Sequence, residues 1–118
     1  MAGEKNFENR LKRWLDAQGV WHVKFFANRN TRAGVPDILA CINGRFVGIE
    51  LKGPNGKPSP LQVYHCGKIT ESGGIAVIVW PDDFAQFKRL VCRLKEKGGN
   101  CDVQDIIFEG RYLHPVPA

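Results

Sequence analysis

The sequence predicts an α/β protein in which a mixed β-sheet is flanked by helices. Three observations predict it: helical and strand-like segments alternate along the chain, Asn43-Gly44 lies between two apolar runs, and residues 45–80 read as strand, helix and strand. Asn-Gly between apolar runs indicates a two-residue type I′ hairpin, whose strands are antiparallel. A β-α-β unit joins parallel strands by a right-handed crossover. The sheet is therefore expected to be mixed.

The first half of the chain supplies one helix and three strands. Apolar residues recur at helical spacing over residues 4–18, and a glycine follows. Residues 20–26 are rich in aromatic and β-branched residues and predict a strand, whereas residues 27–35 are polar and basic and predict a loop. Residues 36–42 and 45–52 are the predicted strands of the hairpin.

The second half supplies the rest of the sheet and its cover. A loop rich in glycine and proline is expected over residues 53–60, then a helix over residues 60–72 with a serine N-cap and a proline at its first position. Residues 75–80 are continuously apolar, as in a strand covered on both faces. A helix capped by an aspartate and ending near residue 97 follows, and residues 103–113 predict a short strand or a packed extension.

Length and composition limit the function classes. With 118 residues we expect one domain over residues 1–118, with a core over residues 4–97 and a C-terminal extension over residues 98–118. The longest apolar run is too short for a bilayer span, and the N-terminal residues lack the apolar segment of a secretion signal. The expected location is the cytoplasm of a bacterium or of a phage-infected host, with no membrane partner.

The charge distribution favours a polyanionic partner. The net charge is +5 and the isoelectric point 9.2, although many domains with this balance bind nothing acidic. Residues 17–70 contain seven basic residues and only two acids, Asp37 and Glu50. Two carboxylates isolated in a basic region require an explanation.

The cysteines do not indicate a metal centre. Cys41, Cys66, Cys92 and Cys101 form no C-x-x-C pair, and no histidine is spaced to complete a zinc site with them. We therefore expect reduced cysteines that serve mainly in packing, and no zinc.

The hairpin predicts which side chains face each other. If Asn43 and Gly44 are the turn residues, the residue numbers of each cross-strand pair add up to 87. Asp37 then lies directly across from Glu50. Their Cβ atoms would then be about 4.5–5.5 Å apart on one face of the sheet, and Lys52 would lie on the same face by the two-residue period. Facing like charges are destabilising unless a positive charge lies between them.

Two carboxylates and an ammonium at one point favour metal-assisted phosphodiester hydrolysis. Carboxylate oxygens suit magnesium or manganese, and a lysine beside such an ion could orient a water or neutralise developing negative charge. The alternatives are structural. Asp37 could be a strand-entry residue, Glu50 and Lys52 could be a solvated pair, and a register slip or a bulge would undo the facing geometry.

The motif resembles that of a known nuclease family. GVPD at residues 34–37, RFVGIELK at residues 45–52 and the later Gln62 resemble the core of the virus-type replication-repair (VRR-NUC) family of the PD-(D/E)xK nuclease superfamily. The likeness extends over residues 8–79 and implies that superfamily's restriction-endonuclease-like αβββαβ core. It also implies a hydrolase that cuts DNA with Mg²⁺ or Mn²⁺.

The resemblance implies a role for each matching residue. Asp37 and Glu50 would be metal ligands together with the backbone carbonyl of Leu51, and Lys52 would be the catalytic lysine. Glu8 matches the family's acidic residue on the first helix, which acts directly or through a water on the metal. Independently of the resemblance, Glu8 could equally be a glutamate favoured by the helix dipole.

Two further sets of residues complete the predicted site. Gln62 would reach it from the first turn of the second helix, although such a residue could also be a surface position. Candidate phosphate contacts share a place in or beside the flanking loops: Lys24, Arg29, Arg32 and Lys57. Each alone reads as a solvated charge, and together they form a basic rim.

The resulting prediction is a metal-dependent, structure-selective DNA endonuclease that resembles Holliday-junction resolvases. Stand-alone members of the family are small dimers, and two sites related by a two-fold axis could cut symmetric strands of a four-way junction in DNA repair. The last helix and the apolar tail could supply the dimer interface. The alternatives are a nuclease of flaps or other nucleic-acid structures, and a non-catalytic nucleic-acid-binding module.

Overall fold

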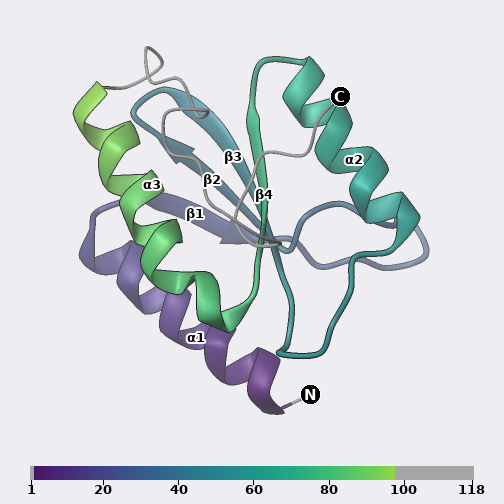
Figure 1. Ribbon diagram of the computed structural model, residues 1–118. Coiled ribbons are helices and arrows are strands. Elements are labelled where there is room, and N and C mark those ends of the chain that lie inside the picture. The colour runs from purple at the N-terminus through teal and green to yellow at the C-terminus, as the bar shows by residue number, and fades with distance from the viewer. Residues whose placement is uncertain (1, 98–118) are drawn as a thin grey trace.

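The structure is a computed structural model that describes residues 2–97 (Figure 1). The predicted order of helix, three strands, helix, strand and helix is confirmed. The elements are α1 (Ala2–Ala17), β1 (Trp21–Lys24), β2 (Ile38–Ile42), β3 (Arg45–Leu51), α2 (Pro60–Glu71), β4 (Ile75–Val79), the 3₁₀ turn η1 (Pro81–Asp83) and α3 (Phe84–Lys97). The predicted tail strand over residues 103–113 lies outside the described residues.

Several elements start or end one or two residues from the predicted bounds, and β1 and the last helix are two of them. β1 stops at Lys24 instead of continuing to residue 26, although Phe25 still donates its N–H to the Asp37 carbonyl at 2.8 Å. The last helix begins at Phe84 because Pro81 starts a 3₁₀ turn in which the Asp83 carboxylate accepts the Trp80 N–H at 3.2 Å. Neither difference moves the predicted site residues.

The four strands form one mixed sheet in the order β1-β2-β3-β4. β1 with β2 and β2 with β3 are antiparallel, and β3 with β4 is parallel across the α2 crossover. Asn43 and Gly44 have φ values of 50° and 83°, as a type I′ turn requires, and Ile42 pairs with Arg45. The register that the sequence predicted is therefore present.

Helices cover the two faces of this sheet unequally. In Figure 1 α1 and α3 lie together on one side of the sheet and α2 lies on the other. The larger core lies under α1 and α3, and a smaller cluster of Cys66, Ala76, Ile78 and Trp80 lies under α2. Because α2 packs on β4 and β3, strands β1 and β2 keep apolar side chains exposed on the α2 side, including Trp21 and Val23. The predicted mixed α/β fold is confirmed.

The described helices also bear on the membrane prediction. None of those within residues 2–97 is both long and apolar enough to cross a bilayer. Of the cysteines, Cys66 is buried, whereas Cys41 and Cys92 are exposed and unpaired.

Candidate active site

Asp37 and Glu50 meet at the end of the hairpin away from its turn. β2 and β3 pair Ile38 with Ile49, and the same register places Asp37 across from Glu50 one position further on. The Asp37 Oδ2 atom accepts the Leu51 N–H at 2.9 Å, which fixes the carboxylate just before β2. The Asp37 carboxylate lies close enough to Glu50 to raise the pKa of that residue. The predicted facing geometry is thus observed.

Glu50 is held in an environment that disfavours its charge. The residue is only 2% exposed, its Oε2 atom accepts the Gln62 amide at 2.8 Å, and Lys52 Nζ lies 3.4 Å away. Its buried Oε1 atom has no hydrogen-bond partner. Burial and the neighbouring Asp37 charge raise the pKa of Glu50 to about 8, against the lowering effect of Lys52. Burial and the facing Asp37 charge therefore outweigh the nearby Lys52 ammonium in their effect on the ionisation of Glu50.

The start of α2 explains why Gln62 reaches Glu50. Ser59 caps the helix by accepting the Gln62 N–H at 3.1 Å, and Gln62 Oε1 accepts the Ser59 N–H at 2.8 Å. This capping box immobilises the Gln62 side chain. Its remaining amide N–H is then directed at Glu50, so one residue both caps the helix and orients a carboxylate.

Glu8 lies in the opposite electrostatic environment. It is 5% exposed on α1, and three ammonium groups contact its carboxylate: Lys24 at 2.7 Å, Lys12 at 3.2 Å and Lys5 at 3.4 Å. Burial alone would raise the pKa of Glu8, but hydrogen bonds from Lys24 and Lys12, with the charge of Lys24, outweigh burial and lower it to about 2. Glu8 is therefore ionised at all physiological pH values, and the three lysine ammonium groups balance its negative charge.

Lys24 connects the two acidic groups. Its Nζ atom lies 2.7 Å from Glu8 Oε1 and 3.8 Å from Asp37 Oδ1. The structure thus joins Glu8 to the carboxylate pair through an ammonium, instead of gathering three acids at one point. Lys24, predicted as a phosphate contact, lies within this ion-pair cluster with 22% of its side chain exposed.

The carboxylate pair fits a hard divalent cation. Within residues 2–97 no group of three or more histidine, cysteine, aspartate or glutamate side chains is arranged to hold a metal. Mg²⁺, however, is commonly held by one or two carboxylates and keeps several waters. An unpartnered buried oxygen on Glu50 beside the Asp37 carboxylate offers that donor set. A peptide carbonyl such as that of Leu51 would add a donor of the same hard class.

The other predicted phosphate contacts lie apart from this cluster. Arg29 and Arg32 are exposed in the loop between β1 and β2, and Lys57 is exposed in the loop before α2. The first of these loops ends at Asp37, and the second leads into the first turn of α2, which contains Gln62. Both loops therefore flank the carboxylate pair, as the sequence predicted.

Sequence reasoning missed the counter-charges of Glu8. Lys5 and Lys12 stand three residues before and four residues after it on α1, which is the spacing at which helical side chains meet. That spacing was a usable signal. The third counter-charge, Lys24, comes from a different element and depends on how α1 packs against β1.

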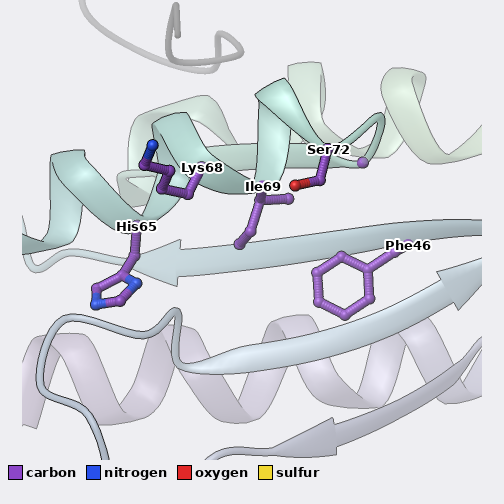
Figure 2. Close-up of a pocket in the computed structure, with 6 residues that line it drawn as sticks. Phe46, His65, Lys68, Ile69 and Ser72 are labelled. Atoms are coloured by element: carbon purple, nitrogen blue, oxygen red, sulfur yellow. The ribbon is translucent and has the colours of Figure 1, made fainter.

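A pocket of about 340 Å³ lies elsewhere on the α2 side. It opens between α2 and β3, and Figure 2 shows Phe46, His65 and Ile69 around it, with Lys68 and Ser72 at its edge. Phe46 pairs with Cys41, next to the hairpin turn, whereas Glu50 is near the other end of β3. The pocket is thus separate from the carboxylate pair.

The opposite pKa shifts of Glu50 and Glu8 predict that removing the two charges changes the stability of the fold in opposite directions. The folded-state pKa of Glu50 lies above its ordinary value, so ionising Glu50 between about pH 4.5 and 8 costs folding free energy. The folded-state pKa of Glu8 is lowered, so its charge adds stability that is lost as pH falls from about 4.5 to 2. At pH 8 without divalent ions, Glu50→Gln should stabilise the protein and Glu8→Gln destabilise it, each by about 1–3 kcal/mol.

Urea denaturation at pH 8 in chelator measures both changes. The two residues are of the same type and nearly equally buried, so each variant is the control for the other. Equal destabilisation by both substitutions would contradict the electrostatic assignment.

Comparisons with solved structures agree with the observed fold. No known sequence-family profile matches the chain, and no curated protein matches it. A solved structure described as a VRR_NUC domain superposes with a TM-score of 0.63 and 25% sequence identity, over 75% of this chain and 94% of that one. The structure of Hjc, a Holliday junction resolvase from the archaeal hyperthermophile Archaeoglobus fulgidus, superposes with a TM-score of 0.52 and 20% identity, over 64% of this chain and 66% of that one. The resemblance to the VRR-NUC family that the motif indicated is therefore confirmed in the fold, with its restriction-endonuclease-like architecture.

Proposed function

We propose that this protein is a divalent-metal-dependent DNA endonuclease of the structure-selective, Holliday-junction-resolvase-like kind. The observation that carries the proposal is the buried Glu50 carboxylate facing the partly exposed Asp37, with one unpartnered Glu50 oxygen and Lys52 Nζ 3.4 Å from the other. Facing acids in a basic protein destabilise it unless they hold a cation. The likeness in fold to a VRR_NUC domain and to a junction resolvase supports the same reading.

Each residue of the site contributes a defined function in this proposal. Asp37 and Glu50 would hold Mg²⁺ or Mn²⁺ with the Leu51 carbonyl. Such an ion supplies Lewis-acid polarisation of the scissile phosphate and a more acidic water. Gln62 keeps the Glu50 carboxylate in one orientation through its 2.8 Å hydrogen bond. Lys52 places an ammonium beside the pair, where it can orient the attacking water and neutralise charge that develops on the phosphate.

Glu8 and Lys24 support the site from the other side. Lys24 lies between the Glu8 and Asp37 carboxylates, so it offsets the negative charge on Asp37 while the Glu8 charge holds it in place. We infer that Glu8 acts on the site through Lys24 and through ordered water.

DNA would approach across the two basic loops. Arg29, Arg32 and Lys57 are exposed on either side of the carboxylate pair, where they can contact phosphates without reading sequence. A non-catalytic binding module is the competing function. It would gain nothing from placing two facing acids where a polyanion approaches, and for this reason we favour the nuclease.

Cleavage assays test the proposal directly. Labelled four-way junction, flap, linear duplex and single strand are incubated with Mg²⁺, with Mn²⁺ and with chelator. The wild-type protein should cut a branched substrate only with a divalent ion. Asp37→Ala, Glu50→Ala and Lys52→Ala should each lower the rate by about 100-fold or more, as expected for groups that act on the transition state.

Glu71→Ala is the matched control for these variants. Glu71 is a half-exposed acid at the end of α2, paired only with Lys68 among the described residues, and its removal should leave the rate unchanged. Cleavage in chelator, or full activity of the Asp37 variant, would exclude the mechanism. Binding without cleavage under every metal condition would favour the non-catalytic module.

A homodimer is part of the proposal, because two copies of one site can cut opposite strands of a symmetric junction. The chain mass is 13.2 kDa. Sedimentation equilibrium of the full chain should then give about twice that mass at micromolar concentration, since dimers of such enzymes are closed two-fold assemblies. The dimer would be contradicted if the free protein has the mass of a monomer and the complex with junction DNA contains only one protein chain.

A further inference from the structure

The loop between β1 and β2 begins with a solvent-exposed aromatic residue, one position after the residue that is hydrogen-bonded to the Asp37 backbone. Phe26 is 75% exposed, more than any other large apolar residue among those the structure describes. The preceding residue, Phe25, donates its N–H to the Asp37 carbonyl at 2.8 Å. Phe26 therefore follows directly on the backbone segment that is bonded to Asp37.

This loop is held in a defined conformation. Asn30 donates its N–H to Asn28 Oδ1 at 2.7 Å, and Asn28 donates its N–H to Thr31 Oγ1 at 2.8 Å, so side chains close the turn. At its far end Gly34 has φ +86° and touches the Leu61 backbone so closely that a Cβ would come within 2.8 Å of it. Leu61 precedes Gln62, which contacts Glu50. The loop is thus braced at both ends against elements that contact the carboxylate pair.

The chemistry of the loop combines an aromatic ring with positive charge. Arg29 and Arg32 are exposed within a few residues of Phe26. Proteins that bind unpaired nucleotides combine cationic side chains along the backbone with aromatic rings on which bases stack. A continuous duplex presents no free base face, whereas a branch, a flap or a frayed end does.

We propose that Phe26 stacks on a base face left free at a branch beside the scissile phosphate and so directs the site to branched DNA. This inference rests on the proposed nuclease function and adds its substrate class and the residue that selects it. The ring supplies the selectivity, because the flanking arginines contact phosphates of duplex and branch alike. The cut phosphate then lies near the branch point, because Phe26 follows the segment bonded to Asp37.

Binding measured in chelator tests the inference without cleavage. The full-length wild type and the variants Phe26→Ala and Phe26→Trp are titrated with a four-way junction and with linear duplex. Both DNAs carry the fluorescent base 2-aminopurine, which in the junction replaces the nucleotide at the branch. Phe26→Ala should weaken junction binding about 5- to 100-fold and leave duplex binding unchanged. It should also abolish the fluorescence change of the branch nucleotide. Phe26→Trp should retain both.

Phe46→Ala is the matched control. Phe46 is also an exposed aromatic residue, 43% exposed, but it borders the pocket of Figure 2 at the hairpin-turn end of the sheet. Its removal should leave the preference for the junction unchanged. An equal loss in Phe46→Ala would show a general effect of removing an exposed ring and would overturn the proposal.

The outcomes separate this inference from the proposed function. If the wild type cuts branched DNA and Phe26→Ala keeps the same ratio of junction to duplex binding, Phe26 does not select the branch and the nuclease assignment stands. If the wild type cuts nothing with any metal but the junction preference depends on Phe26, the nuclease assignment fails and the stacking contact stands. Failure of the wild type to bind branched DNA more tightly than duplex overturns the stacking proposal.

Discussion

The placement of two like charges face to face is the constraint on which the site depends. The type I′ turn at Asn43 and Gly44 sets the pairing of β2 and β3, and that pairing carries Asp37 to Glu50. Since a one-residue slip would send one of the acids to the opposite face, the turn controls the chemistry from the far end of the hairpin. The surrounding groups then serve to keep this unfavourable pair in place.

The two buried glutamates lie in opposite electrostatic environments. Glu8 is compensated by three lysines and its pKa falls to about 2, whereas Glu50 is buried beside Asp37 and its pKa rises to about 8. The first arrangement stabilises the fold, and the second costs stability unless a cation is bound. Strain of this kind at one position, offset elsewhere, is typical of functional sites. This difference in environment distinguishes Glu8 from Asp37 and Glu50, the two proposed metal ligands.

Local rules were sufficient to predict the centre of the site. The Asn-Gly turn and the two-residue period placed Asp37, Glu50 and Lys52 together, and the Ser59 cap with Pro60 marked the start of α2. Relations between distant elements could not be predicted in this way. The Lys24 bridge from Glu8 to Asp37 depends on the packing of α1 against β1, and the exposure of Phe26 depends on where β1 ends. Neither follows from the period of a single segment.

The binding of Mn²⁺ to the DNA-free protein tests the central claim most directly. In titrations followed by electron paramagnetic resonance, the wild type should bind Mn²⁺, and Asp37→Asn and Glu50→Gln should each weaken binding by about tenfold or more, since each removes one anionic oxygen ligand. Glu71→Gln should bind as the wild type does. Wild-type affinity in both the Asp37 and Glu50 variants would contradict the account, because the facing carboxylates would then hold no metal.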